Sequence, residues 1–260
     1  MTGMPTSFLI GLSAGIFGGL VGIGGGVVMI PLMISFGKLG QHKAHGTSLI
    51  ALVFTGIIGA STYALHSALD VEAALLLAVA ALLPARLGAR FCCDVPALTL
   101  QKAFGVIIII ISIILLSKPY LPSVAHLDSG TPRALVLLAT GAVTGFFSGL
   151  MGVGGGPIMI AAMVLLAGFD QHTAQGCSLL AMVPAGAVGA FTHWRLGNVE
   201  KGVLKGLISG IIMGTFAGGS FAHLLPEFSL RVVFAVVLIF TGIRMIKAPA
   251  PSCERGGVEA

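Results

Sequence analysis

Two copies of a short polar group contain the side chains of this sequence best suited to binding a small ligand. The copies read QHKAHGTSLIA and QHTAQGCSLLA, begin at residues 41 and 171, and contain the candidates Gln41, His42, Ser48, Gln171, His172 and Ser178. Amide and hydroxyl groups are neutral hydrogen-bond donors that suit an oxyanion, and an imidazole adds a charge that titrates near neutral pH. The same groups begin two apolar segments, where they would also serve as helix caps without any further role. The sequence leaves both interpretations open.

A run of glycines precedes each polar group, inside an apolar segment. The runs are GLVGIGGG and GLMGVGGG, and their candidate binding positions are Gly24, Gly25, Gly26, Gly154, Gly155 and Gly156. A glycine costs up to about 1 kcal/mol relative to alanine in a helix interior, so these runs predict broken helices. A backbone break within a membrane persists only where protein or a wet cavity surrounds it. Helices that restart near Val27 and Pro157 would therefore point free N–H groups at a site that favours an anion.

Other glycines have a simpler interpretation. Small residues recur every four positions along the two segments, at Gly11, Gly15, Gly19, Gly141, Gly145 and Gly149. This spacing favours close packing between membrane helices. The GxGGG runs also resemble a nucleotide-binding loop, but no Lys-Ser/Thr pair follows them, and they lie in apolar segments rather than after a strand. We therefore exclude a nucleotide site.

The composition indicates that lipid surrounds these motifs. The chain has 260 residues, of which 56% are hydrophobic and only 9% charged, and its mean hydropathy is +1.05. A soluble domain carries about 25% charged residues. Eight segments are apolar, several of them long enough to span a bilayer: 5–37, 44–67, 71–91, 99–117, 134–168, 174–196, 200–224 and 228–247. We expect an all-α polytopic membrane protein, whose net charge of +5 reflects cytoplasmic Lys and Arg rather than a nucleic-acid partner.

The sequence repeats itself with an offset of 130 residues. Gly11, Gly22 and Gln41, for example, correspond to Gly141, Gly152 and Gln171. Internal repeats in membrane proteins are typical of transporters, whose halves form a site at their interface. We predict a first transmembrane repeat over 1–117, an inter-repeat loop over 118–132, a second transmembrane repeat over 133–247 and a disordered tail over 248–260, which together make one transport domain.

The positions of Lys and Arg predict that the repeats are inverted. Eight simple crossings would divide the 14 basic residues almost evenly between the two sides. If the first segment of each half turns back at its glycines, most basic residues collect on one side, and Lys118, Arg133 and Arg231 lie on the other. Cytoplasmic loops are rich in Lys and Arg, so both termini are expected in the cytoplasm. Whether each broken segment crosses the bilayer or re-enters it stays open.

The sequence shows no set of residues arranged for catalysis or metal binding. The four cysteines lack the spacing of a zinc site, and no Ser-His-Asp arrangement is evident. Asp70 and Glu200, at matching repeat positions, are expected to precede helices, where a carboxylate suits the helix dipole. We therefore expect no enzyme, no catalytic residue, no cofactor and no resident metal.

The doubled motif resembles the TauE/SafE sulfite exporter family. The residues that carry this resemblance are GLVGIGGGVVMIP and GLMGVGGGPIMI, each followed by QH.A.G.SL, and it extends over nearly the whole chain. It implies a secondary transporter of the bacterial inner membrane that moves sulfite, sulfonates, thiosulfate or related organic anions. It also implies that the candidate glycines, glutamines, histidines and serines line the substrate site. The family motif usually ends in proline, which Pro31 retains and Ala161 replaces, although Pro157 is present.

Three functions remain as hypotheses. The favoured one is an exporter or permease for a small anion that works by alternating access in the bilayer, driven by protons or by the substrate gradient, as a monomer or a homo-oligomer. The second is a divalent metal-cation permease that uses His42, His172 and Cys177, which the lack of a central carboxylate disfavours. The third is an intramembrane enzyme or a scaffold. An enzyme needs a catalytic pair at membrane depth, and a scaffold has no need of the glycine breaks.

Overall fold

The regular structure of the chain is helical throughout the residues that the structure describes. The computed structural model describes residues 4–91, 97–118, 131–151 and 155–247. In these ranges the helices are α1 (Met4–Val21), α2 (Gly26–Ser35), α3 (Gln41–Leu65), α4 (Val71–Phe91), α5 (Ala97–Ser117), α6 (Thr131–Met151), α7 (Gly156–Leu166), α8 (Gln171–Arg195), α9 (Lys201–Leu224) and α10 (Glu227–Lys247). This confirms the all-α prediction. The predicted disordered tail, 248–260, lies outside the described residues.

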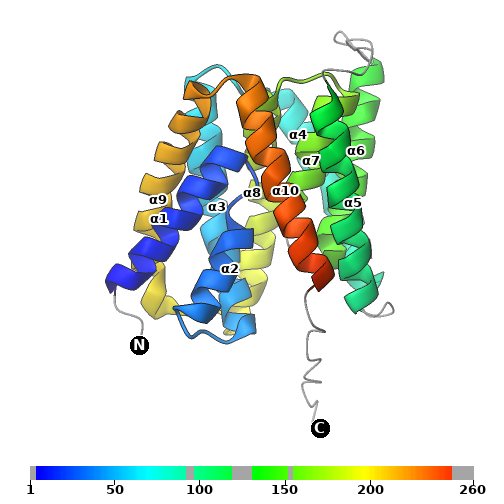
Figure 1. Cartoon of the computed structure of the whole chain (residues 1–260). Coiled ribbons are helices and arrows are strands. Elements are labelled where there is room, and N and C mark those ends of the chain that lie inside the picture. The colour runs from blue at the N-terminus through cyan, green and yellow to red at the C-terminus, as the bar shows by residue number, and fades with distance from the viewer. Residues whose placement is uncertain (1–3, 92–96, 119–130, 152–154, 248–260) are drawn as a thin grey trace.

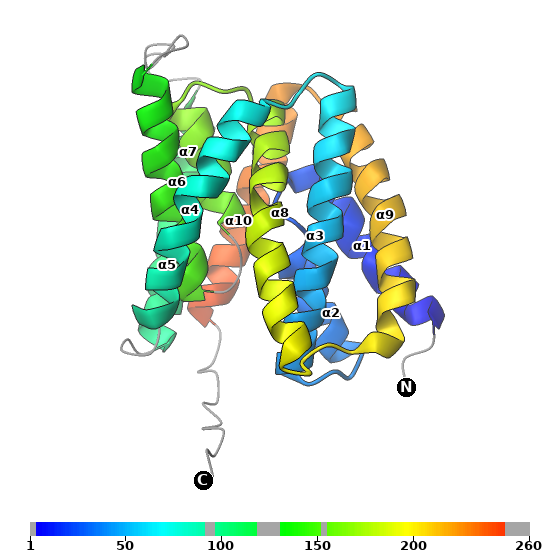
Figure 2. The same cartoon turned by 180° about the vertical axis from the view of Figure 1, so that it is seen from behind.

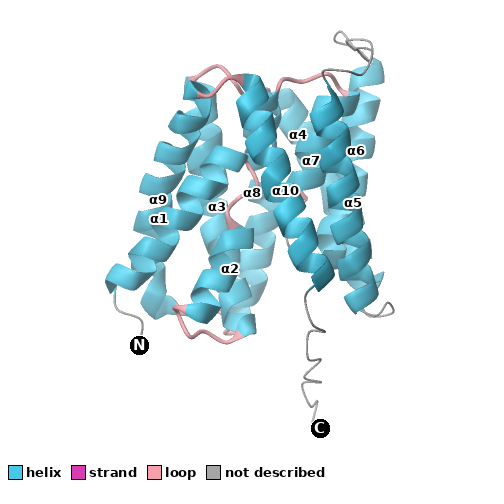
Figure 3. Ribbon diagram, viewed as in Figure 1, coloured by secondary structure: helices cyan, strands magenta, loops and turns pink. Residues whose placement is uncertain are grey.

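The first break in helical geometry falls at the first glycine run. Between α1 and α2, Gly22, Gly24 and Gly25 have φ values of 77°, 83° and 73°. L side chains rarely adopt this left-handed region, which explains why the sequence uses glycine here. Figure 3 shows the break as a loop near the middle of the bundle, and Figure 1 shows α2 returning towards the end from which α1 starts. The glycines therefore turn the chain back within the bundle.

The second break separates α6 from α7. Helix α7 begins at Gly156 with Pro157 in its first turn, a position where the missing N–H of proline has no helical partner to lose. Gly155 has a φ of −84°, so a close approach rather than a left-handed backbone requires glycine there. A Cβ added to Gly155 would lie 2.9 Å from the Thr144 carbonyl oxygen. Gly154 lies outside the described residues.

Small residues bring two helix pairs into close contact. A Cβ added to Gly15 of α1 would lie 2.8 Å from the Ile211 carbonyl oxygen of α9. A Cβ added to Gly145 of α6 would lie 2.6 Å from the Ala81 Cα atom of α4. The second contact is the first one displaced by 130 residues. Backbone contacts of this kind at Gly11, Gly15, Gly19, Gly141 and Gly145 confirm the helix-packing prediction for these five glycines, and each half supplies one helix of each pair.

Long apolar helices and apolar exposed surface identify the surroundings of the bundle. Among the described residues, five helices are long and apolar enough to cross a membrane: Met4–Val21, Lys43–Leu65, Gln171–Arg195, Lys201–Leu224 and Glu227–Lys247. Large apolar side chains such as Leu83, Val79 and Phe240 are more than 60% exposed, at 71%, 65% and 68%. Such side chains belong in lipid, because a water-exposed surface of this kind would aggregate.

Asp70 and Asp170, immediately before α4 and α8, cap these two helices. The Asp170 carboxylate accepts a hydrogen bond from the Thr173 amide at 2.9 Å, and the Asp70 carboxylate accepts one from the Ala73 amide at 3.0 Å. The N-caps of α3 and α9 are Gly40 and Glu200. The predicted places of Asp70 and Glu200 are therefore confirmed. The capping interpretation of the two polar groups is wrong, since each group lies inside its helix rather than at its cap.

The connections between helices lie at two opposite ends of the bundle. In Figure 2 the connection from α2 to α3 lies at the bottom, and the connection from α7 to α8 lies at the top. The start of α1 and the end of α10 share the bottom end (Figure 1). Helices α3 and α8, which carry the two polar groups, thus enter the bundle from opposite ends.

Candidate functional site

One face of α8 carries three fully buried polar side chains. Gln171, Gln175 and Ser178 are spaced by four and three residues, which places them on the same side of a helix, and each is 0% exposed. Both amide atoms of Gln171, Nε2 of Gln175 and Oγ of Ser178 have no hydrogen-bond partner within the protein. An unsatisfied buried polar group costs about 1–3 kcal/mol. This polar stripe therefore presents unused hydrogen-bonding groups in the interior of the bundle.

The polar stripe faces the place where the two glycine breaks meet. A Cβ added to Gly22 would lie 2.7 Å from the Gln175 Cβ atom. One turn further along α8, the Met182 Cε atom would lie 3.6 Å from a Cβ on Gly24 and 3.1 Å from one on Gly156. The same Cβ on Gly156 would lie 3.4 Å from the Ile23 Cα atom. At Gly22 an added Cβ would overlap Gln175, so the lack of a side chain there lets the first break lie directly against α8.

A tyrosine from α3 ties the polar stripe to the first break. The Tyr63 hydroxyl lies 2.7 Å from Gln175 Oε1 and 3.0 Å from the Gly19 carbonyl oxygen, and these two accepting oxygens share its single hydrogen. Tyr63 is itself 0% exposed. One hydroxyl thus links α3, α8 and the last turn of α1, and it leaves the Gln175 Nε2 group as an unused donor.

Gln175 was not among the residues that we selected from the sequence. The sequence feature that could have identified it is the helical spacing Gln171–Gln175–Ser178. A comparison that looks for the same residue type in both copies misses this feature. The first copy has the same spacing in Gln41, His45 and Ser48. Residue 45 is histidine where residue 175 is glutamine, so an alignment of the two halves alone does not mark the position.

The structure uses the two copies differently. Ser48 is 5% exposed, but its Oγ donates to the His45 carbonyl oxygen of its own helix at 2.8 Å, whereas Ser178 Oγ has no partner. Gln41 and His42 lie in the first turn of α3, and their side chains are outside the described part of the chain. His172 contacts α9 instead, with Nε2 3.2 Å from the Ala222 carbonyl oxygen.

Space is available at the start of α2. Gly26 is the first residue of this helix, and a Cβ added to it would meet no atom within 4 Å. The first N–H groups of a helix have no partner within the helix and carry the positive end of its dipole. The start of α2 therefore offers backbone donors and room close to the Gly22–Gly25 turn.

Charged groups lie at the two ends of the bundle rather than at the polar stripe. At one end, the Lys43 Nζ atom donates to Glu200 Oε2 at 2.9 Å, and this hydrogen bond lowers the pKa of the Glu200 carboxyl below its ordinary value. At the other end, Arg133 Nη2 donates to Asp70 Oδ2 at 2.5 Å. Asp70 and Glu200 occupy equivalent repeat positions. Each end of the bundle thus carries an ion pair built on the equivalent acidic residue.

Arg133 and a second basic residue, Lys118, both contact Phe169 in the loop that precedes α8. The Arg133 guanidinium lies 4.4 Å from the centre of the Phe169 ring, and the Lys118 ammonium lies 3.5 Å from the Phe169 carbonyl oxygen. Burial lowers the pKa of the Lys118 ammonium, and the charge of Arg231 lowers it further. Arg231 pairs with Glu227 on its own helix. The charges at this end are therefore largely paired.

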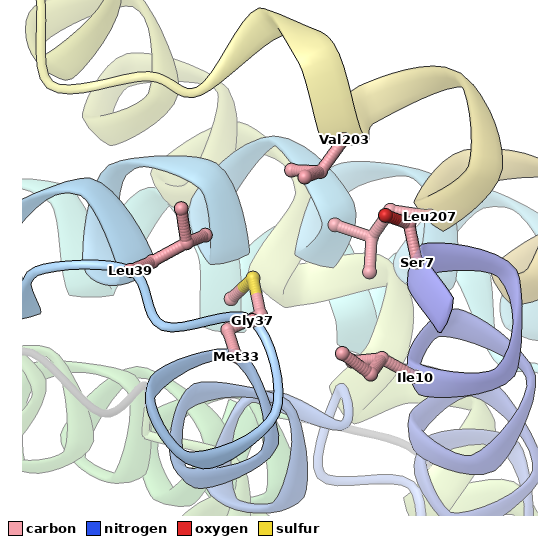
Figure 4. A pocket seen from close by; sticks show the side chains of 7 residues that line it. All are labelled: Ser7, Ile10, Met33, Gly37, Leu39, Val203 and Leu207. Carbon is pink, nitrogen blue, oxygen red and sulfur yellow. The ribbon is translucent and has the colours of Figure 1, made fainter. Parts of the chain in front are cut away.

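A small apolar hollow lies apart from the polar stripe, between α1, α9 and the connection from α2 to α3. Figure 4 shows Ile10, Met33, Leu39 and Leu207 around it, with the Ser7 hydroxyl as its polar side chain. Its lining offers no charge to hold an anion. Among the described residues, no group of three or more His, Cys, Asp or Glu side chains is placed to hold a metal ion.

These features define a class of protein. Interrupted helices that meet beside a buried polar stripe, inside a bundle with an apolar exterior, are the arrangement of a membrane transporter. The chain belongs to the family described as "Sulfite exporter TauE/SafE", whose family model matches residues 7–245. The match confirms the family resemblance carried by the doubled glycine motif.

Curated relatives are named as membrane transporters. The chain is 27% identical to the probable membrane transporter protein YunE of Bacillus subtilis, over 92% of this chain and 95% of the relative. It is 24% identical to YdhB of the same organism, over 89% and 96% of the two chains. It is 27% identical to MJ0441 of Methanocaldococcus jannaschii, over 76% and 74%. No solved structure matches the chain. Family and relatives point to a multi-pass membrane transporter and not to an enzyme.

Proposed function

We propose that the protein is a secondary transporter of small sulfur-containing or organic anions, such as sulfite or sulfonates. The observation that carries this proposal is the polar stripe of α8, where Gln171, Gln175 and Ser178 keep unpartnered polar groups in a fully buried position. Amide and hydroxyl donors stabilise an oxyanion without a compensating positive charge. The family description supports sulfite as the first candidate.

The anion binds between the polar stripe and the starts of α2 and α7. The side chains of α8 supply donors from one side, while the first N–H groups of α2, next to the open space at Gly26, supply them from the other. The two helix dipoles supply the positive potential that the neutral side chains lack. The proposed site includes the predicted binding positions Gly24–Gly26, Gly155 and Gly156, together with Gln175.

Transport then proceeds by alternating access. In the arrangement described above the polar stripe is closed to both ends of the bundle, because its three side chains are 0% exposed. Helix α1 moves together with α9, and α6 with α4, since glycine-mediated backbone contacts hold each pair. The left-handed glycines between α1 and α2 supply the backbone freedom that such a movement requires.

The two repeats, 1–117 and 133–247, are inverted, with both termini in the cytoplasm of a bacterial cell. The opposite ends at which the α2–α3 and α7–α8 connections lie support this arrangement (Figure 2). The distribution of Lys and Arg supports the orientation, with Lys118, Arg133 and Arg231 at the outer end. Protons are the proposed coupling ion.

Ligand-dependent thermal unfolding of the purified protein tests the proposal. A ligand that binds only the folded state at a concentration 100 times its Kd stabilises it by about 2.7 kcal/mol. We expect sulfite or a sulfonate to raise the unfolding temperature, and Gln175→Leu to abolish that rise. The matched control is Thr215→Val, which removes a buried and equally unpartnered hydroxyl outside the polar stripe and should keep the rise.

Two results would overturn the proposal. The first is stabilisation by divalent metal ions alone, which would favour a cation permease. The second is a full sulfite effect in Gln175→Leu, which would place the anion elsewhere. A proteoliposome assay of sulfite flux with the same pair of variants then separates binding from transport.

A further inference from the structure

Three histidines from three helices stack on one another at the end of the bundle opposite the start of α1. The ring centres of His66 and His223 lie 4.2 Å apart with a 10° angle between the planes, and those of His223 and His172 lie 5.0 Å apart with a 19° angle. His66 follows α3, His172 lies in the first turn of α8, and His223 lies in the last turn of α9. The tops of these helices adjoin one another in Figure 2. We call this group the histidine stack.

Backbone carbonyl groups fix the hydrogens of the two outer rings. The Nδ1 atom of His66 lies 2.9 Å from the Thr62 carbonyl oxygen, and the Nε2 atom of His172 lies 3.2 Å from the Ala222 carbonyl oxygen. A carbonyl oxygen only accepts, so each of these ring nitrogens carries its hydrogen. The other nitrogen of each ring is left as a base. In the middle ring, Nε2 of His223 is buried and has no partner.

The spacing of the rings limits how many protons the histidine stack holds in this arrangement. Two imidazolium charges about 4–5 Å apart repel each other strongly in a partly buried site. The carboxylate that acts on His223 is Asp170, and its oxygen already accepts from the Thr173 amide. Tyr63 is the other titratable group that faces the ring. The closed stack therefore accommodates one positive charge, and a second proton favours separation of α3 and α9 from α8.

The histidine stack is continuous with the polar stripe. The edge of His223 contacts the Tyr63 ring, with centres 4.7 Å apart and planes at 60°. Tyr63 in turn holds Gln175 Oε1 and the Gly19 carbonyl oxygen through its hydroxyl. Along this line the side chains change from exposed at His66 to fully buried at Gln175. Separation of the stack would pull on the contact that closes Gln175.

We propose that His66, His172 and His223 form a proton-binding site that closes this end of the transporter while it holds at most one proton and opens the route to the polar stripe when a second proton binds. The protons come from water at the exposed side of His66 and bind to ring nitrogens, with no redox step. This inference rests on the proposed anion-transport function and adds to it the place where the coupling ion binds.

The test measures access to the polar stripe without any substrate. The background variant replaces Cys92, Cys93 and Cys253 by serine and Cys177 by threonine, the residue at the equivalent position 47. One reporter is Ser178→Cys, in the polar stripe. The other is Ser7→Cys, which is also buried but lies near the opposite end, beside the hollow of Figure 4. The rate of N-ethylmaleimide labelling in detergent is measured for both, and their ratio removes the intrinsic effect of pH on thiol reactivity.

We expect the ratio of Ser178→Cys to Ser7→Cys labelling to rise by about tenfold from about pH 7.5 to about pH 5.5, since an opening linked to one proton changes by up to tenfold per pH unit. His223→Phe keeps a flat ring in the stack but cannot bind a proton, so the ratio should stay at its high-pH value. His193→Phe, a histidine near the other end of α8, is the matched control and should keep the rise. If His223→Phe does not fold, His66→Gln at the exposed ring takes its place.

The proposal is overturned if the labelling ratio of the two reporters does not change with pH when the histidine stack is intact. It is also overturned if the ratio rises undiminished when His223→Phe or His66→Gln is added. Neither result bears on the proposed anion binding, because the labelling is measured without any anion. Conversely, a proton-dependent rise with no stabilisation by sulfite or sulfonates leaves the proton site in place and refutes the proposed substrate class. The failures of the two proposals are therefore distinguishable.

Discussion

The adjacent glycines at the start of α2 should respond in opposite ways to the same substitution. Gly25 has a φ of 73°, and a Cβ added to it would lie 2.6 Å from the Ala14 carbonyl oxygen. Gly26 begins the helix, and its added Cβ would meet no atom within 4 Å. Gly25→Ala is therefore strained both by its backbone and by its surroundings, whereas Gly26→Ala is strained by neither.

The size of the difference follows from these two terms. A left-handed conformation costs an L residue roughly 1–2 kcal/mol, and forcing an extra carbon into a packed position costs about 1–3 kcal/mol. We therefore expect Gly25→Ala to lower the free energy of unfolding by about 2–5 kcal/mol. Gly26→Ala restricts the unfolded chain without strain, and we expect it to raise stability by about 0.4–1 kcal/mol.

The assay is the apparent unfolding temperature of each detergent-solubilised variant at one fixed heating rate, because such unfolding is commonly irreversible. One kcal/mol corresponds to about 2–4 °C in a chain near this size, so a loss of about 2–5 kcal/mol should make Gly25→Ala unfold about 4–20 °C below the unmodified protein. Gly26→Ala should unfold at the same temperature or slightly above it. Equal temperatures for both variants, or a less stable Gly26→Ala, would refute the argument that positive φ and close packing select glycine at this break.

Three further predictions use the same measurement. Tyr63→Phe removes the hydroxyl that two buried carbonyl oxygens share and should cost about 1–3 kcal/mol, so an unchanged unfolding temperature would contradict its bridging role. The Glu200 carboxyl has a lowered pKa, so its pairing with Lys43 stabilises the fold at neutral pH, and this stabilisation is lost as the pH falls through that lowered pKa. Lys43→Gln should therefore be less stable than the unmodified protein at neutral pH and equally stable in acid. A stability difference that persists in acid would exclude the ion pair as its cause. Cys177→Thr should leave stability unchanged, because Cys177 Sγ accepts from the Asp70 amide at 3.3 Å as Thr47 Oγ1 accepts from the Glu200 amide at 3.1 Å, and Cys177→Ala should be less stable than Cys177→Thr.

Much of the fold could be predicted from the sequence because its signals are local or periodic. Apolar length and low charge identify membrane helices, and glycine runs mark the places where helices stop. The break after Val21 lies where Gly22–Gly26 placed it, and the helix starts after Asp70 and Glu200 lie where the carboxylates placed them. Residues separated by 130 positions in the sequence also make equivalent contacts in the structure, as Gly15 and Gly145 do.

The candidate site could be predicted only in part because its contacts join distant residues. Gln171 and Ser178 were selected from the sequence, but their role depends on the lack of hydrogen-bond partners, which no pattern of residue types reveals. Gln175 gains its place from Tyr63, which lies 112 positions earlier in the chain. The partners of His66 and His223 could not be named from the sequence, because three different helices bring the histidine stack together. Tertiary contacts of this kind cannot be inferred from the local spacing of residues.

The exchange of helices between the two halves bears on how the protein is made. Helix α1 is synthesised first, yet its glycine-lined face packs against residues near Ile211 of α9, which leave the ribosome about two hundred residues later. Helix α4 likewise lacks its packing partner until α6 has been synthesised. The first half of the chain therefore inserts with an unpaired helix face that the second half must cover. Biogenesis of the first half depends on the second, so separately expressed halves should be stable in the membrane only when both are present.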